Sequence, residues 1–134
     1  MYKRDLITAE IQKLSQAIAR ILGLKQEGKL EEADNGLNEM LEADFGILFS
    51  DLVSCDPTDF MAFLTEKNFP AEKLEILSQV LYIKFGIIEQ PAERKSVAEK
   101  LQLTYETLEV KHHVVNMNNL SRQKTVKDYL NQNG

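Results

Sequence analysis

Apolar residues recur at helical spacing along most of the chain. The first such stretch, Lys3 to Gln26, carries a seam of five large apolar residues that step by four, three, four and three positions. This spacing is typical of a coiled coil or of a helix packed in a bundle. The seam consists of Ile7, Ile11, Leu14, Ile18 and Ile21. The pattern therefore predicts a long first helix with one apolar face.

Gly28 separates this helix from a second one. A glycine just past a helical pattern can adopt the left-handed backbone conformation that ends a helix. Apolar residues then return at helical spacing from Leu30 to Asp44, and Gly36 lies within that stretch. Because glycine inside a helix costs about 1 kcal/mol relative to alanine, Gly36 indicates a close helix–helix contact. The two helices are expected to form an antiparallel hairpin.

Helix start signals divide the rest of the chain. Asp56 is suited to cap a helix and Pro57 to occupy its first position. A helix that is apolar on nearly all sides belongs at the centre of a domain, which is the expectation for the stretch that follows Pro70. The predicted later helices are a short one reaching Ser54, then Pro57–Lys67, Pro70–Ile88, Pro91–Met117 and Asn119–Asn131. We therefore predict a single all-α domain over residues 1–134, with six or seven helices stacked as antiparallel hairpins.

The first hairpin resembles a tetratricopeptide-type helix pair, mainly over Leu14–Phe45. The resemblance rests on a glycine before the second helix, a small residue that packs against the first helix, and large apolar residues that follow. These are Gly28, Leu30, Ala33, Leu37 and Leu41, and the pattern departs from the family at Ile21, Met40 and Phe45. No second copy occurs at the family's period of about 34 residues. The whole chain also resembles small uncharacterised bacterial helical proteins, and the resemblance implies a TPR-like scaffold that binds a partner.

Composition and charge narrow the class of protein. With 134 residues, 43% hydrophobic and 28% charged, the chain fits one soluble globular domain. Its single cysteine, Cys55, cannot form an intramolecular disulfide. The net charge is −5, and residues 31–75 hold twelve acidic against two basic side chains. This acidic middle disfavours nucleic acid and anionic lipid as main partners, and without an apolar leader or membrane span we expect a cytoplasmic protein.

Candidate chemical groups are few. His112 and His113 are neighbours on a predicted helix, where their side chains point about 100° apart and cannot readily share one metal ion. Cys55 precedes the acidic Asp56, whose charge disfavours a thiolate. The carboxylates between Asp44 and Asp59 lack the ligand spacing and central glycine of a calcium loop. We expect no metal, no cofactor and no catalytic residue, so the protein is predicted not to be an enzyme.

The leading functional expectation is a non-catalytic protein-interaction or assembly module. One candidate surface is the seam of the first helix, which could pair with a second copy to form a homodimer, although such seams more often pack inside their own domain. The other is an acidic surface that would favour a basic partner, through Glu31, Glu32 and Glu39.

Two alternatives stay open at this point. One is a small-ligand binder or enzyme with a pocket between the fifth and sixth helices, near Tyr82, Tyr105 and His112. The other is weak nucleic-acid binding through the basic C-terminal end, which contains Lys111, Arg122, Lys124 and Lys127.

Overall fold

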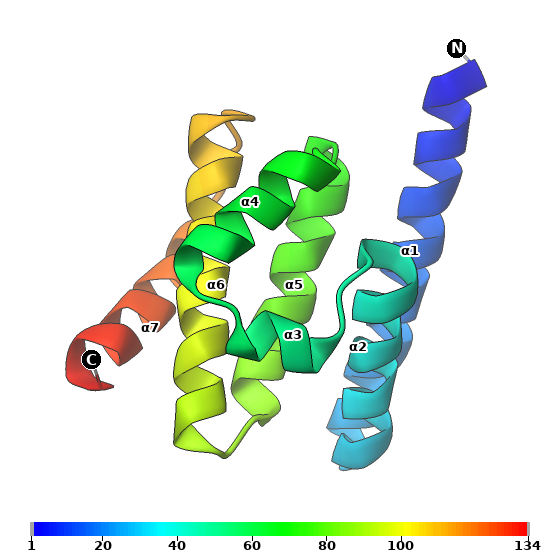
Figure 1. The fold of residues 1–134 in the computed structure, drawn as a ribbon. Helices are drawn as coiled ribbons and strands as arrows, with labels where there is room; N and C mark the ends of the chain where they lie inside the picture. Colours follow the sequence, from blue (N-terminus) through cyan, green and yellow to red (C-terminus); the bar gives the residue numbers. More distant parts are fainter. Residues whose placement is uncertain (1, 134) are drawn as a thin grey trace.

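The computed structural model describes the backbone of residues 2–133 and the side chains of residues 6–132. Its secondary structure is entirely helical over these residues, which confirms the all-α prediction. The helices are α1 (Tyr2–Gln26), α2 (Leu30–Phe45), α3 (Phe49–Ser54), α4 (Pro57–Lys67), α5 (Ala71–Ile87), α6 (Pro91–Val110) and α7 (Met117–Asn133) (Figure 1).

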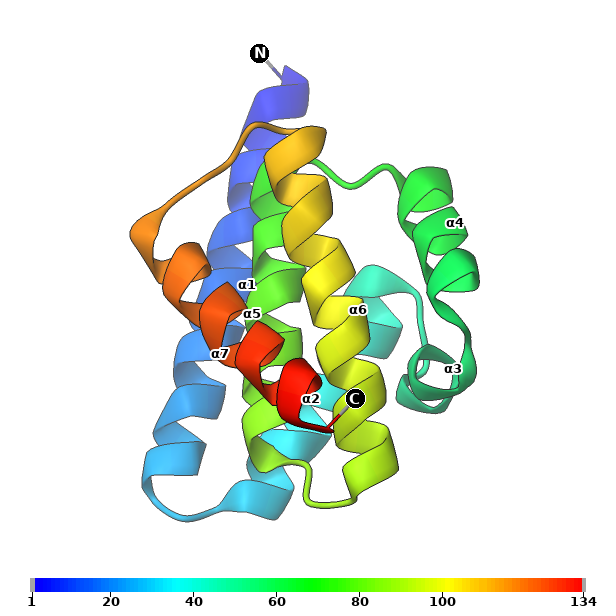
Figure 2. The same ribbon diagram turned by 90° about the vertical axis from the view of Figure 1, so that its left-hand side faces the viewer.

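Two antiparallel pairs form the body of the protein. α1 packs against α2, and α5 packs against α6 (Figure 1). α5 also contacts α1 and α2, so it joins the two pairs and takes the central position that its sequence predicts. The short helices α3 and α4 connect the pairs and pack on α6, while α7 crosses α6 obliquely (Figure 2).

Local sequence explains where several helices begin and end. Gly28, with φ +81°, provides the left-handed residue of the tight turn between α1 and α2. A second left-handed glycine, Gly46 with φ +73°, ends α2 and was not singled out from the sequence. Asp56 caps α4 as predicted, because its Oδ1 accepts a hydrogen bond from the Asp59 backbone N–H at 2.8 Å.

The core is continuous and centres on α5. Apolar side chains of α5 such as Leu77, Val80 and Leu81 are fully buried. The predicted close contact at Gly36 is present, since a Cβ placed there would lie only 3.1 Å from Cγ1 of Ile21. Glycine at this position therefore allows α2 to approach α1.

One predicted helix was too long. The sequence pattern extended the sixth helix to Met117, but α6 ends at Val110. His113 then adopts a left-handed conformation with φ +57°, and Asn116 begins a new helix by accepting a hydrogen bond from the Asn119 N–H at 2.9 Å. The break after Val110 is a left-handed C-terminal turn at His113, closed by the Val114 N–H, which donates to the Leu108 carbonyl at 2.9 Å. No glycine marks this turn, and hydrophobic periodicity alone does not reveal it.

No helix in the described part of the chain is both long and apolar enough to cross a membrane.

Candidate binding groove

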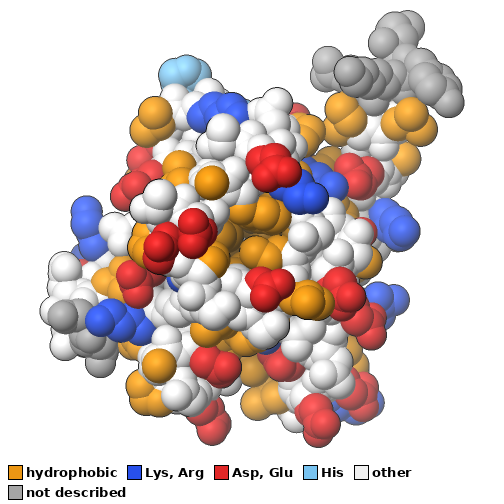
Figure 3. Space-filling model, viewed as in Figure 1, with side chains coloured by type: hydrophobic (Ala, Val, Ile, Leu, Met, Phe, Trp, Pro, Cys, Tyr) orange, Lys and Arg blue, Asp and Glu red, His pale blue; other side chains and the backbone are white. Residues whose placement is uncertain are grey.

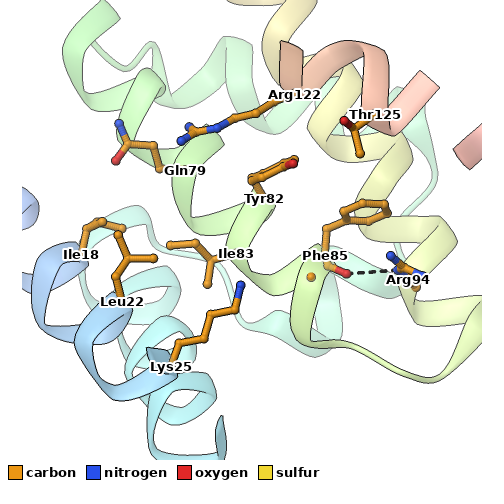
Figure 4. Close-up of a pocket in the computed structure, with 11 residues that line it drawn as sticks. Ile18, Leu22, Lys25, Gln79, Tyr82, Ile83, Phe85, Arg94, Arg122 and Thr125 are labelled. Atoms are coloured by element: carbon orange, nitrogen blue, oxygen red, sulfur yellow. Dashed lines mark hydrogen bonds between the residues drawn. The ribbon is translucent and has the colours of Figure 1, made fainter. Parts of the chain in front are cut away.

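A groove of about 340 Å³ lies over α5, between α1 and α7 (Figure 4). Its floor is apolar and includes Ile18 and Leu22 of α1 together with Ile83 and Phe85 of α5. Its polar part is formed by three cations, two neutral polar side chains and a tyrosine, with a glycine at one end. These are Lys25, Arg94, Arg122, Gln79, Thr125, Tyr82 and Gly86.

The three cations of the groove come from three different helices. Lys25 lies in the last turn of α1, Arg94 in the first turn of α6, and Arg122 in α7. In Figure 4, Lys25 extends toward Ile83, whereas Arg122 reaches across α5 between Gln79 and Tyr82. The fold therefore gathers positive side chains that are up to 97 positions apart in the sequence, Lys25 and Arg122 being the extremes.

Aromatic rings hold the two guanidinium groups in place. The Arg94 Nε donates a hydrogen bond to the Phe85 carbonyl at 3.1 Å, and its Cζ lies 4.5 Å from the centre of the Phe85 ring. The Cζ of Arg122 lies 5.1 Å from the centre of the Tyr82 ring. Such stacking orients a planar guanidinium while its other N–H groups remain able to bind an acceptor.

The Lys25 ammonium lies against α5 at Gly86. A Cβ built on Gly86 would lie 3.6 Å from the Lys25 Nζ, which is an ordinary van der Waals distance. This contact places the cation at the Gly86 end of the groove.

The groove contains positive charge without a compensating carboxylate. None of the described residues that line it is acidic. Nor does any of the three cations form an ion pair within the described part of the chain. The acidic residues lie elsewhere, and many of them cover the face formed by α2, α3 and α4 (Figure 3). In a chain of net charge −5, the lining of this groove is therefore locally positive.

A second hollow of about 290 Å³ adjoins the groove near the start of α7 and shares Gln79 and Arg122 with it. Asn116 connects its walls, since its Nδ2 donates to Glu75 Oε1 at 2.9 Å while its Oδ1 caps α7. Asn119 also lines the hollow and is only 6% exposed, yet its Nδ2 has no hydrogen-bond partner.

Of the three residues of the predicted pocket, one lines this groove. Tyr82 lines the groove, but Tyr105 and His112 are absent from its lining. Tyr105 is 1% exposed with an unpartnered hydroxyl, and burial raises the pKa of that hydroxyl. The pKa of His112 is lowered, mainly because desolvation of its partly buried ring disfavours the charged form. The groove lies between α1 and α7 on α5 rather than between α5 and α6.

Sequence reasoning did not find most of the groove. Arg122 was noted only as one of several C-terminal cations, and Lys25, Arg94 and Gln79 carried no motif. In the sequence, a cation in the last turn of a helix, such as Lys25, is indistinguishable from one that complements the helix dipole.

The first-helix seam divides into two parts. Leu14, Ile18 and Ile21 are buried in the protein's own core, whereas Ile7 and Ile11 are partly buried near the projecting N-terminal end of α1 (Figure 1). The buried three are already occupied by contacts within the domain. Only the N-terminal part of the seam is accessible to a second copy.

The predicted acidic surface lies on α2. Glu31, Glu32 and Glu39 are all exposed, and Glu32 and Glu39 share a face because they are seven residues apart. Its basic partner stays a prediction.

The remaining sequence candidates are Cys55 and the possible metal ligands. Cys55 is partly buried, its Sγ donates to the Leu52 carbonyl at 3.4 Å, and burial raises the pKa of the thiol while Lys100 opposes that rise. No group of three or more histidine, cysteine, aspartate or glutamate side chains among the described residues is arranged to hold a metal ion.

Comparison of the chain with family models, with curated proteins and with solved structures finds no match. The tetratricopeptide resemblance of the first hairpin therefore stays a prediction.

Proposed function

We propose that the protein is a non-catalytic interaction module and that its groove between α1, α5 and α7 binds an acidic segment of a partner protein. The observation that carries this proposal is the convergence of Lys25, Arg94 and Arg122 on a groove with no acidic side chain in its described lining. Like charges brought together repel one another, so a bound carboxylate relieves an unfavourable arrangement as well as making new contacts.

The floor of the groove favours a peptide segment over a free inorganic ion. Leu22, which is 41% exposed beside the buried Ile18 and Ile83, offers apolar surface that a phosphate or sulfate would leave uncovered. A segment with one large apolar side chain beside an acidic one would use both the floor and the cations. The volume of about 340 Å³ lies at the small end of the range of roughly 300–1,000 Å³ for ligand sites, which suits a few side chains.

The lining favours binding over catalysis. It offers cations, an amide, hydroxyls and apolar side chains, but no histidine, cysteine or carboxylate among the described residues. A nucleophile with an adjacent general base is the usual requirement of acyl or glycosyl transfer, and the groove does not supply that pair.

Selection from a random peptide display library tests the proposal without knowledge of the partner. The wild-type protein is expected to enrich sequences that contain aspartate or glutamate beside a large apolar residue. A Lys25→Gln/Arg122→Gln double variant should bind a selected peptide at least tenfold more weakly, about 1.4 kcal/mol.

The matched control is Arg20→Gln/Lys124→Gln. It removes two exposed positive charges from the same two helices, α1 and α7, but neither residue lines the groove. Equal losses in both double variants would show that net charge alone attracts the peptides. A library without acidic enrichment would overturn the proposal. If the simple dicarboxylate succinate instead stabilises the wild type but not the groove variant, the ligand is a small anion.

A further inference from the structure

We propose that α7 undocks from α5 and α6 as one unit while the other helices stay folded, and that a partner segment bound in the groove holds α7 in its docked position. This regulation rests on the proposed function, because α7 supplies one wall of the groove described there. The docking of α7 would then control whether the binding site is complete.

Unpaired buried groups gather where α7 meets the rest of the protein. Three buried polar atoms without a hydrogen-bond partner occur among the described side chains, namely Tyr105 Oη, His112 Nε2 and Asn119 Nδ2. Asn119 lies in the first turn of α7, and His112 lies in the connection that leads to it. The Tyr105 hydroxyl, on α6, interacts electrostatically with Arg122 of α7 and Tyr82 of α5, so it lies near both helices. All three atoms therefore belong to the region that attaches α7.

The other buried polar side chains of the described chain are paired. Those that come from helices other than α7 all form hydrogen bonds, and they are Ser78, Lys84, Lys100 and Thr104. Burying a donor or acceptor without a partner is destabilising, because its hydrogen bonds to water are lost. Undocking of α7 would return the Tyr105 hydroxyl and the Asn119 amide to water. These groups therefore weaken the attachment of α7 in particular.

Few apolar side chains attach α7 to the body of the protein. Val126 is the one fully buried apolar residue of α7 in its described part, whereas Tyr129 and Leu130 are only partly buried. Met117 is 81% exposed and Leu120 is 44% exposed. The helix packs mainly on α6 and crosses the outside of it (Figure 2). Because an element with few buried apolar contacts opens at a lower free energy than the whole domain, α7 can open by itself.

Docking of α7 also completes the groove. α7 contributes Arg122 and Thr125 to the lining, and Lys25 of α1 and Arg94 of α6 supply the other cations. Docking without a ligand brings Arg122 toward these like charges, which repel it. A bound acidic segment instead attracts Arg122 and favours the docked position. Since a ligand that binds one state better shifts the equilibrium toward that state, the bound segment and the docked helix stabilise each other.

Native-state hydrogen exchange of the full chain tests the undocking without any ligand. The backbone amides of α7 are expected to exchange at least about tenfold faster than those in the middle of α5, and to share one dependence on denaturant concentration because they open together. Simple fraying would instead give protection that increases steadily from Asn131 back to Met117. Either fraying or exchange of α7 only together with α5 would overturn the inference.

Variants of the attachment test its physical basis. Val126→Ala removes the buried apolar residue, so it should speed exchange of α7 at least about tenfold and leave α1 and α2 unchanged. It should also weaken binding of a peptide recovered from the display selection. Val115→Ala, at a 59% exposed site before α7, is the matched control and should change neither quantity.

Tyr105→Phe tests the unpaired hydroxyl and keeps the test decisive if Val126→Ala does not fold. Removing a buried hydroxyl that has no partner should slow exchange of α7 about fivefold or more. Added to Val126→Ala, it should recover part of the lost peptide affinity. Faster exchange of α7 in Tyr105→Phe would overturn the assignment of this hydroxyl as a destabilising group.

The selected peptide tests the coupling between binding and docking. At a free concentration of about 100 times its Kd, the peptide should slow exchange of α7 about 100-fold, because it binds the docked state. A bound peptide that leaves exchange of α7 unchanged would overturn this inference and leave the groove proposal standing. A selection without acidic enrichment would overturn the groove proposal and the coupling together, whereas exchange without ligand still decides whether α7 undocks.

Discussion

The cations on the two sides of α5 differ in whether a carboxylate pairs with them. On the side toward α2 and α3, Lys84 is 1% exposed, and its Nζ donates to Asp34 at 2.6 Å and to Asn38 at 2.8 Å. The same ammonium lies 3.6 Å from the centre of the Phe49 ring. On the groove side, Lys25 and the two arginines have no carboxylate partner within the described part of the chain.

This difference separates a structural cation from candidate binding cations. Burying an ammonium is unfavourable unless it is paired and hydrogen-bonded, and the contacts of Lys84 meet that requirement. They also link α5 to α2 and to the start of α3. Within the described part of the chain, the groove cations contribute no comparable link to an acidic side chain. Like charges gathered in one groove repel one another. A cation whose charge is compensated inside the fold stabilises the fold, whereas uncompensated cations in a groove are available to a ligand.

The largest effect is expected when the structural cation loses its carboxylate. Asp34→Ala should lower the free energy of unfolding by about 3 kcal/mol, near the low end for a broken buried pair because Asn38 and Phe49 still contact the ammonium. Chemical denaturation followed by circular dichroism measures this loss.

Two controls make that measurement specific. Glu31→Ala, at an exposed site on the same helix, should change stability by less than about 0.5 kcal/mol. Adding Lys84→Met to Asp34→Ala should recover part of the loss, because no unpaired charge then stays buried. A loss below about 1 kcal/mol in Asp34→Ala would show that the pair does not hold α2 and α5 together.

A smaller effect is expected when a groove cation is neutralised. Lys25→Gln should change the free energy of unfolding by no more than about 0.5 kcal/mol, since the residue has no ion-pair partner to lose and its removal reduces repulsion. Thermal unfolding at low and high salt measures this, and the difference between the wild type and the variant should shrink as salt screens the repulsion. A loss of more than about 1 kcal/mol would instead make Lys25 a structural residue, as Lys84 is.

The features that could be predicted from the sequence are those with a local signal. The seam that ends at Ile21, the glycine at position 28 and the cap at Asp56 are local signals, and each specified an element that the structure contains. The end of α6 depends on the left-handed conformation of His113, at a position where glycine is the usual sequence signal, so periodicity did not predict it.

The role of each cation was not visible in the sequence for a related reason. Lys84 interrupts an apolar run, and Arg122 belongs to a mildly basic tail. Neither local pattern predicts which residues contact the cation in the folded protein. Asp34 is fifty positions from Lys84, and Lys25 is 97 positions from Arg122. Only packing of the helices decides that one cation meets a carboxylate and the others meet a groove.

His112 provides the smallest test of the comparison, because it would become a buried cation if it took up a proton. Its Nε2 is buried without a partner, and desolvation lowers the pKa of the ring, with Lys111 and His113 acting in the same direction and Glu72 opposing them. The unfolded chain therefore binds this proton more readily than the folded protein. The resulting stability is present above the ordinary pKa of about 6.5 and is lost as the pH falls below it.

We accordingly expect His112→Gln to flatten the decline in stability between pH 7 and pH 5, a change that cannot exceed about 1.4 kcal/mol per pH unit for one proton. Melting temperatures across this range, with the exposed His113→Gln as control, measure the difference between the two slopes. If His112→Gln left the slope unchanged, the ring would accept a proton in the folded protein as readily as in the unfolded chain. Burial of the His112 ring without a carboxylate partner would then not disfavour its charged form. The argument that a buried cation needs a partner such as the one Lys84 has would lose its support in this protein.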